Sequence, residues 1–312
     1  MELFPSNSNF NFMRVRMASL AIALIIMFVA FGAMAIKGFN YALDFTGGTV
    51  AELRFNTPVD AEQVRQRLQS SGFESPVVQT FGTGNDIVIR LKPRPGDGDA
   101  ARSGDAIVRA AQTVDNPAQL LRSESVGPQI GKELAINGMY AAMFVVLGFL
   151  AYVWIRFELK FAVAALVTTL HDVVLVAGWF ALSGHEFDLT VLAGILSVMG
   201  YSINDTIVVF DRVRENFRTL HKLSPVEVLN RSINQTLSRT IITSFVALLT
   251  VLALYFFAGA SLRGMAESQI IGIVIGTLSS IFVACPLLRL LGANKQDLMP
   301  RLRDDAELAR RP

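Results

Sequence analysis

The sequence predicts an α-helical membrane bundle of six transmembrane helices, with one α+β domain inserted between the first and second helices. Only 17% of the 312 residues are charged and 52% are hydrophobic, whereas soluble domains carry about a quarter charged residues. Six apolar stretches have the roughly 20 residues needed to cross a hydrocarbon core of about 30 Å. Between the first two, residues 37–135 are as charged as a soluble domain.

These apolar stretches divide the chain into segments. The six spans are predicted at residues 17–36, 136–155, 161–182, 189–210, 240–258 and 267–290. The division gives an N-terminal segment (1–16), a first helix (17–36), an outer domain (37–135), a block of five helices (136–290) and a tail (291–312).

The first apolar stretch has an alternative interpretation as a cleaved signal peptide. Ala33-Met34-Ala35 resembles a cleavage site. The apolar run of about 20 residues is longer than the usual core of a signal peptide, which has about 7–15. We therefore expect this stretch to be retained as a transmembrane helix.

Lysine and arginine in the short connections predict the orientation, because basic connections stay in the cytoplasm. Basic residues gather before the first span, in the 156–160 joint, in the 211–239 loop and in the tail. The opposite connections, 183–188 and 259–266, together contain one arginine, Arg263, and no lysine. Both termini are therefore expected in the cytoplasm, and the 37–135 domain outside.

The outer domain is predicted to follow the order strand, helix, strand, strand, helix, strand. Its strands are expected at 49–55, 77–81, 87–91 and 120–126, with helices starting at a capping box (Asp60-Ala61-Glu62-Gln63) and spanning 100–113. A Gly82-Thr83-Gly84-Asn85 turn and a Pro93–Asp99 loop join them. This order fits a split βαβ, ferredoxin-like domain. Since the domain holds no histidine and no pair of nucleophile and base, we expect a binding or packing module.

Polar residues inside the spans are the candidate functional groups, because ionisable side chains there are costly unless paired. Thr168, His171 and Asp172 share one face of the third span. A second polar stripe in the fourth span comprises Ser197, Tyr201, Asn204, Asp205 and Val208. We expect the two stripes to face each other or a shared interior.

Arg239, at the start of the fifth span, is a plausible partner for Asp205. Asp205 lies six residues before Asp211, about 9 Å along a helix, a depth that an arginine side chain can approach. A buried carboxyl group beside a guanidinium is subject to two opposed effects on its ionisation, so it could bind and release a proton. The alternative is a static polar clamp of Asp205, Asn204 and Arg239. For His171 and Asp172, proton handling and hydrogen bonding between helices stay equally open.

Other features point away from enzymes and nucleic-acid binding. No Walker loop, HExxH motif or nucleophile elbow is present, and the single cysteine, Cys285, excludes a cysteine metal cluster. We expect no metal and no cofactor, and the net charge of +2 does not suggest nucleic acid. Gly272, Gly276 and Ser280 form a ridge of small residues suited to helix packing, and Pro286 is expected to kink the sixth span.

Four strings resemble the SecD/SecF family and together cover nearly the whole chain in order. Asp44-Phe45-Thr46-Gly47-Gly48 is similar to the family's DFTGG signature, and residues 127–133 (GPQIGKE) to its GPxIGxE-like element. His171-Asp172 and residues 200–216 (GYSINDTIVVFDRVREN) match as well. The plan of six spans and one small outer domain resembles the family member with the smaller outer region.

The resemblance implies an export subunit of the resistance-nodulation-division superfamily in the bacterial inner membrane. Implied partners are SecD, the SecYEG channel and YajC, and implied cargo is an unfolded exported polypeptide, drawn out on the periplasmic side by proton flow. In the family, the residues matching Asp205 and Arg239 lie on the proton path. Asp44, outside the membrane, is expected to serve hinge or packing duty.

Two competing functions remain at this stage. A small-molecule or lipid exporter of the same superfamily would usually carry two large outer domains and about twice as many spans. An intramembrane enzyme would need Asp172 and Asp205 to converge and share a proton.

Overall fold

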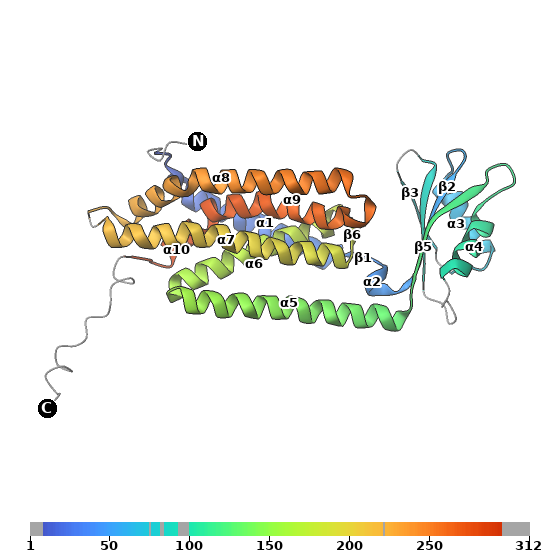
Figure 1. Cartoon of the computed structure of the whole chain (residues 1–312), viewed down its shortest axis with the longest axis horizontal. Helices are drawn as coiled ribbons and strands as arrows, with labels where there is room; N and C mark the ends of the chain where they lie inside the picture. The colour runs from blue at the N-terminus through green and yellow to red at the C-terminus, as the bar shows by residue number, and fades with distance from the viewer. Residues whose placement is uncertain (1–8, 75, 82–83, 93–99, 221, 295–312) are drawn as a thin grey trace, which may run out of the picture. The chain divides into compact units, whose positions relative to one another are not determined.

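The computed structural model describes residues 9–74, 76–81, 84–92, 100–220 and 222–294. The expected Pro93–Asp99 loop, the first half of the 82–85 turn and most of the 291–312 tail lie outside these residues. The chain divides into two compact units. The larger one holds Met1–Asn40, Ala142–His185 and Thr190–Pro312, and the smaller one Tyr41–Ala141 and Glu186–Leu189 (Figure 1).

Six long apolar helices are present among the described residues, which confirms a helical membrane bundle. They are α1 (Arg16–Ile36), α5 (Pro128–Arg156), α6 (Leu159–Ser183), α7 (Leu189–Thr219), α8 (Pro225–Phe257) and α9 (Ala260–Ser279). The last is continued by a π-helical segment, η2 (Ser280–Ala284), and by α10 (Cys285–Leu290). A short helical turn, η1 (Phe12–Val15), precedes α1.

Four of the helices extend well beyond the predicted spans. α5 begins at Pro128 rather than at 136 and α9 at Ala260 rather than at 267, while α7 continues to Thr219. α8 begins at Pro225, where the sequence Ser224-Pro225-Val226-Glu227 predicts a capped helix that leads into the fifth span. α8 starts at the Ser224 capping box, in which Ser224 Oγ accepts from Glu227 N and Glu227 Oε2 accepts from Ser224 N. Buried Phe217 and Leu229 lie in these extensions, so apolar packing continues past the limit set by hydropathy alone.

The sixth span has a local irregularity instead of a plain α-helix. Pro286 lacks the N–H that would bond to the carbonyl of residue 282. The backbone widens into the π-helical η2 just before it, and α10 then resumes the α-helical course. The disturbance expected at Pro286 thus appears as a π segment on its N-terminal side.

The smaller unit follows the predicted order of elements: β2 (Gly48–Phe55), α3 (Ala61–Ser70), β3 (Val77–Phe81), β4 (Asp86–Leu91), α4 (Ala100–Ala111) and β5 (Ala118–Val126). The strands form one sheet in the order β3-β4-β2-β5, and each neighbouring pair is antiparallel. Both helices cover one face of this sheet (Figure 1).

The core of the smaller unit reflects the alternation along its strands. Leu53 and Phe55 on β2 and Ile87 and Ile89 on β4 are buried, and Val64 of α3 packs on them. Every second residue of a strand points to the same face, so the apolar members all meet the helices.

Three short elements were not predicted. α2 (Leu43–Thr46) overlaps the first three residues of the DFTGG signature, and β1 (Asn40–Tyr41) pairs with β6 (Glu186–Phe187). Two-residue strands and a single helical turn leave no periodic pattern in a sequence, so hydropathy could not reveal them.

Candidate functional site in the helix bundle

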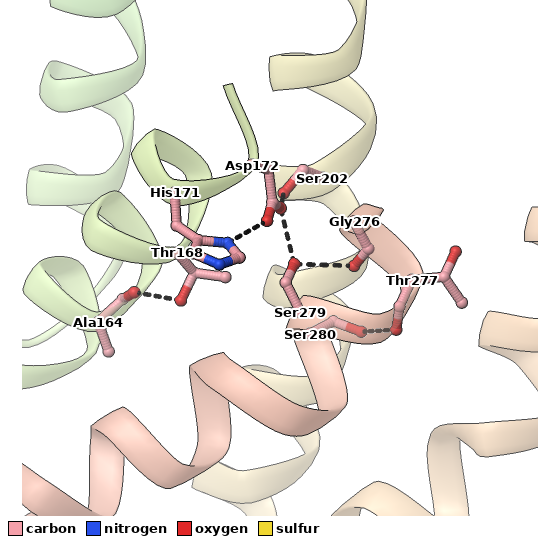
Figure 2. A network of polar contacts seen from close by, with 9 residues as sticks. All are labelled: Ala164, Thr168, His171, Asp172, Ser202, Gly276, Thr277, Ser279 and Ser280. Carbon is pink, nitrogen blue, oxygen red and sulfur yellow. Dashed lines mark hydrogen bonds and ion pairs between the residues drawn. The ribbon is translucent and has the colours of Figure 1, made fainter. Parts of the chain in front are cut away.

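Asp172 on α6 is the centre of a buried polar network that joins three helices (Figure 2). Its side chain is fully buried. Oδ2 accepts hydrogen bonds from Ser202 Oγ of α7 at 2.5 Å and from Ser279 Oγ of α9 at 2.6 Å. Oδ1 lies 2.9 Å from Nδ1 of the neighbouring His171. One carboxyl group therefore connects α6, α7 and α9.

The polar face predicted on α6 is buried, but only part of it forms hydrogen bonds with the Asp172 network. His171 Nε2 is buried and has no hydrogen-bond partner among the described residues. Thr168 Oγ1 donates to the Ala164 carbonyl of its own helix at 2.8 Å. Of the three residues in this stripe, His171 and Asp172 join the network and Thr168 does not.

Asp205, one turn after Ser202 on α7, occupies a separate buried position. Its relative exposure is 6%. Oδ1 accepts from Thr240 Oγ1 of α8 at 2.7 Å. Oδ2 is buried with no partner at hydrogen-bond distance in the described part of the chain, and the Ser280 hydroxyl group, which donates to the Thr277 carbonyl, also interacts with this carboxyl group. A carboxyl group bonded on one oxygen and bare on the other has room for one proton.

Asp205 and Arg239 do not form a direct ion pair among the described residues, although the positive charge of Arg239 acts on the Asp205 carboxyl group. The ion pairs recorded for the described residues do not join these two side chains. Arg239 is exposed, whereas the next residue, Thr240, is buried and faces Asp205. Successive helical residues point about 100° apart, so only one of the two can face α7 directly.

The stripe predicted on α7 is shifted around the helix. Asn204 and Ser197 are exposed, and the buried polar residues are Ser202, Asp205 and Thr206. Asn204 therefore does not contribute to the buried network of this chain. The predicted helical spacing was appropriate, but the polar face that is buried contains Ser202 and Thr206 in place of Tyr201 and Asn204. The buried face is therefore rotated by about one residue from the predicted one.

A second set of hydroxyl groups links α7, α8 and α9. Tyr201 Oη donates to Ser244 Oγ at 2.6 Å, and Thr277 Oγ1 donates to the same oxygen at 2.7 Å. Ser244 Oγ donates in turn to the Thr240 carbonyl at 2.7 Å. Thr240 thus touches both this set and Asp205.

Small residues allow α7 and α9 to approach closely. A Cβ added to Gly194 would collide with Ser268, and one added to Gly272 would collide with Val198. At Gly276, a Cβ would lie 3.4 Å from Ser202 Cβ and 3.8 Å from Asp172 Oδ2. The predicted glycine ridge is therefore what brings the hydroxyl groups of α9 to Asp172.

The two buried carboxyl groups are not a catalytic pair. Asp172 and Asp205 bond to different partners, and within the described residues no hydrogen bond connects them. The shared proton that aspartyl chemistry needs has no geometric basis here.

The DFTGG signature lies in the smaller unit and binds the start of α7. Asp44 Oδ2 accepts from the backbone N–H of Leu189, the first residue of α7, at 3.1 Å. Gly47 and Gly48 both have positive φ, +66° and +119°, and a Cβ on Gly48 would collide with the Leu91 carbonyl. Side chains are strained in this region of φ, which explains two successive glycines.

The other signature residues fix the same turn. The Phe45 ring lies 5.8 Å from Tyr41 and 6.0 Å from Phe187 between centroids. Thr46 Oγ1 donates to the Ala42 carbonyl at 3.1 Å. Gly131, in the GPQIGKE element, packs on this turn, since a Cβ there would lie 3.0 Å from Gly47 N.

Sequence reasoning missed the hydroxyl partners of both carboxyl groups, namely Ser202, Ser279 and Thr240. Each is a common residue in transmembrane helices and none is ionisable, so none was singled out. Their positions in the sequence could have indicated them, because Ser202 is one helical turn from Asp205 and Thr240 directly follows Arg239.

Comparison with known proteins identifies the chain. Residues 106–294 match the family model for the C-terminal region of the protein export membrane proteins SecD/SecF, and residues 32–59 match the SecD/SecF GG motif. The chain belongs to the SecD/SecF family. It is therefore a multi-pass protein-export membrane protein, and the motifs named above are SecD/SecF motifs.

Curated SecD/SecF relatives resemble it over almost their whole length. It is 44% identical to the protein translocase subunit SecF of Pseudomonas aeruginosa, over 93% of this chain and 94% of that one. For the SecF of Escherichia coli O157:H7 the identity is 40%, over 93% and 90%.

Solved SecDF structures share the fold. The crystal structure of SecDF from Thermus thermophilus matches 92% of this chain with a TM-score of 0.82 and 39% identity. A SecDF structure in a super-membrane-facing form matches 90% with a TM-score of 0.66 and 40% identity. This chain spans about two fifths of the SecDF chains, 39% and 38%.

Proposed function

We propose that the chain is the SecF-type accessory subunit of a Sec protein translocase, in which proton flow through the helix bundle drives or completes export of unfolded polypeptides. Asp205 is the proposed proton carrier. The observation that carries this proposal is its bonding: a 6% exposed carboxyl group on α7 with one hydrogen bond, from Thr240, and one buried bare oxygen.

An ionised carboxyl group in that position is expensive, because a charge inside the membrane must be paired or hydrated. Protonation of Oδ2 would remove the charge and leave the Thr240 bond intact. The membrane potential supplies about 2.3 kcal/mol per charge for each 100 mV. A conformational equilibrium that differs between the two protonation states would convert this energy into movement.

The other polar residues take supporting roles. Arg239, exposed beside Thr240, would lie on the proton path as a fixed positive charge that balances ionised Asp205, since a guanidinium is not deprotonated in proteins. Exposed Asn204 would face the same route. We assign Asp172 and His171 to holding α6, α7 and α9 together, because the Asp172 carboxyl group is bonded on both oxygens.

The setting follows from the family. The relatives are named as translocase subunits and the solved neighbours as SecDF, so SecD is the expected partner, with the SecYEG channel and YajC beyond it. We place the protein in the bacterial inner membrane with both termini in the cytoplasm and residues 37–135 in the periplasm. The first helix is expected to be retained, since Met13 N and Phe10 N bond to Asn230 and Asn234 of α8.

We infer that the periplasmic domain is ferredoxin-like. Its element order is that of a split βαβ, and β4 lies between β2 and β3, the two strands joined by α3. Such a domain offers no catalytic pair, in keeping with a part that contacts and moves with the polypeptide.

The test is Asp205→Asn, with the chain and SecD together in membrane vesicles. Asparagine keeps an acceptor for Thr240 but cannot carry the proton, so a static clamp would survive this change. We expect loss of proton-gradient-dependent release of an exported polypeptide, with Glu74→Gln, an exposed carboxyl-to-amide change outside the helix bundle, as the control. Unchanged release in Asp205→Asn would leave only the clamp.

A further inference from the structure

A narrow apolar hollow opens between α5, α6 and α7 in the larger unit. Its volume is about 150 Å³ and its walls are apolar side chains apart from Thr169. They include Val153 and Trp154 of α5, Ala162 and Leu166 of α6, and Met199 and Ile203 of α7. The hollow lies toward the end of the bundle where α5 stops at Arg156 and α6 begins at Leu159.

A polar pocket lies at that same end. It has a volume of about 410 Å³ and is lined by Arg156, Asp211, Arg214, Glu215, Arg218 and Thr219. On α7, Ile203 of the hollow and Arg214 of the pocket are eleven residues apart. This spacing is about three helical turns, so both residues lie on the same face of α7 and the two spaces follow one another along it.

The pocket carries an excess of positive charge. Its three arginines face one aspartate and one glutamate, a net charge of +1. Arg156 binds Asp211 at 2.8 Å and Arg214 binds Glu158 at 2.9 Å, but a guanidinium has five N–H donors, so both have donors to spare. Arg214 Nε is buried and has no partner among the described residues.

The arginines are also held in position. The guanidinium carbons of Arg156 and Arg214 lie 5.2 and 5.3 Å from the centroid of the same ring, Phe157. Phe157 is itself buried in the joint between α5 and α6. The basic groups are thus fixed around one aromatic anchor.

We propose that this pair of spaces binds one anionic phospholipid, with an acyl chain in the apolar hollow and the phosphate at Arg156, Arg214 and Arg218. A phospholipid carries an apolar acyl chain, which fits the apolar hollow, next to an anionic phosphate, which fits the arginine-lined pocket. Basic pockets between transmembrane helices are known to take such head groups. A partner helix is about 10–12 Å across with its side chains, which a hollow of this volume does not admit.

Trp154 provides a direct reporter, since the chain has two tryptophans. In the full-length Trp179→Phe protein, Trp154 is the only one. Vesicles would contain fixed amounts of phosphatidylglycerol and phosphatidylcholine, with bromine on the acyl chains of one or the other. We expect brominated phosphatidylglycerol to quench Trp154 with about fivefold or greater preference, since each basic residue near the surface contributes roughly a fivefold preference.

The Trp154→Phe protein serves as the internal comparison, because Trp179 lies outside both spaces. Its quenching should show no preference. Equal quenching by both lipids at Trp154 would overturn the proposal. An equal preference at both tryptophans would also overturn it, because the whole surface would then attract anionic lipid.

Two sets of variants separate the parts of the site. Arg156→Gln with Arg218→Gln should abolish the preference at Trp154, whereas Arg231→Gln, an exposed arginine outside the pocket, should keep it. Ala162→Leu should reduce quenching by filling the hollow, and Val167→Leu, exposed on the same helix, should not. A preference that survives the double arginine change would refute the phosphate assignment.

Discussion

At the scale of single residues, two buried carboxyl groups of one bundle differ in how fully they are bonded. Asp172 is bonded on both oxygens to a histidine and two serines, whereas Asp205 receives one bond from Thr240 and keeps a bare oxygen. A fully bonded group holds structure, and a partly bonded one is free to change protonation. This contrast is the basis for assigning proton transfer to Asp205.

Replacement of Ser202 by alanine tests the holding role of Asp172. The change removes one of its three hydrogen bonds and should lower the free energy of unfolding by about 1 kcal/mol, the usual range for bonds between transmembrane helices. Ser197→Ala is the matched control, because Ser197 is exposed on the same helix and bonds to its own backbone. Denaturant unfolding in detergent measures both. Equal losses would show that the Asp172 network is not stabilising.

The site was predictable in its ionisable members and not in their partners. Asp172, His171 and Asp205 stood out because charges inside spans are rare. The exposed position of Asn204 and the choice of Thr240 over Arg239 depend on the rotation of each helix about its own axis. That rotation follows from packing against neighbours, which a single helical pattern does not contain.

At the scale of elements, hydropathy located all six helices but not their ends. α7 and α8 continue for many residues beyond the predicted spans, stabilised by buried apolar residues and by the Ser224 cap. In the smaller unit, alternation and capping located strands and helices to within a few residues. The short β1, α2 and β6 are held by tertiary bonds, such as Ala42 N to the Phe187 carbonyl at 2.9 Å, and are invisible to local patterns.

Glycine substitutions test the packing of α7 on α9. Gly272→Ala should destabilise the protein by about 1–3 kcal/mol, because the added methyl group would collide with Val198 and force the helices apart. Gly148→Ala on α5 has open space around it and should be neutral or stabilising, since alanine is the better helix former. Unfolding in detergent compares the two. A Gly272→Ala protein as stable as Gly148→Ala would contradict the close approach.

At the scale of the whole molecule, the signature motif is bonded to the first residue of α7, which itself belongs to the smaller unit. Asp44 bonds the first N–H of α7, and α7 continues without interruption to Asp205 and on to Thr219. Asp205 is sixteen residues after Leu189, about 24 Å along the helix. A displacement of α7 at Leu189 would therefore be carried by one continuous helix to Asp205.

Close to that junction lies a titratable group whose effect extends to the stability of the whole chain. Burial raises the pKa of Glu186 above its ordinary 4.5 and outweighs the attraction of Arg90, its ion-pair partner. The folded protein therefore holds this proton more tightly than the unfolded chain. By contrast, the hydrogen bond from Arg54 lowers the pKa of Asp86 below 3.8, so the stability from that pair is lost only as the pH falls further.

The titration of Glu186 should therefore change the free energy of unfolding at pH values above 4.5, its ordinary pKa. The Asp86 pair does not contribute to the change in this range, because its stability is lost only at lower pH. As the pH rises through the window from 4.5 to the raised value, the unfolded state releases its proton first, and the free energy of unfolding falls. Glu186→Gln removes this titration, so the variant should lose less stability than the original protein over the same rise in pH. Melting of the full chain in detergent measures the difference, with the exposed Glu74→Gln as control. If the two carboxamide variants showed the same pH slope, the pKa of Glu186 would be the same in the folded and unfolded chains, and the net effect of burial proposed here would be wrong. A difference of the opposite sign would show that the Arg90 pair dominates.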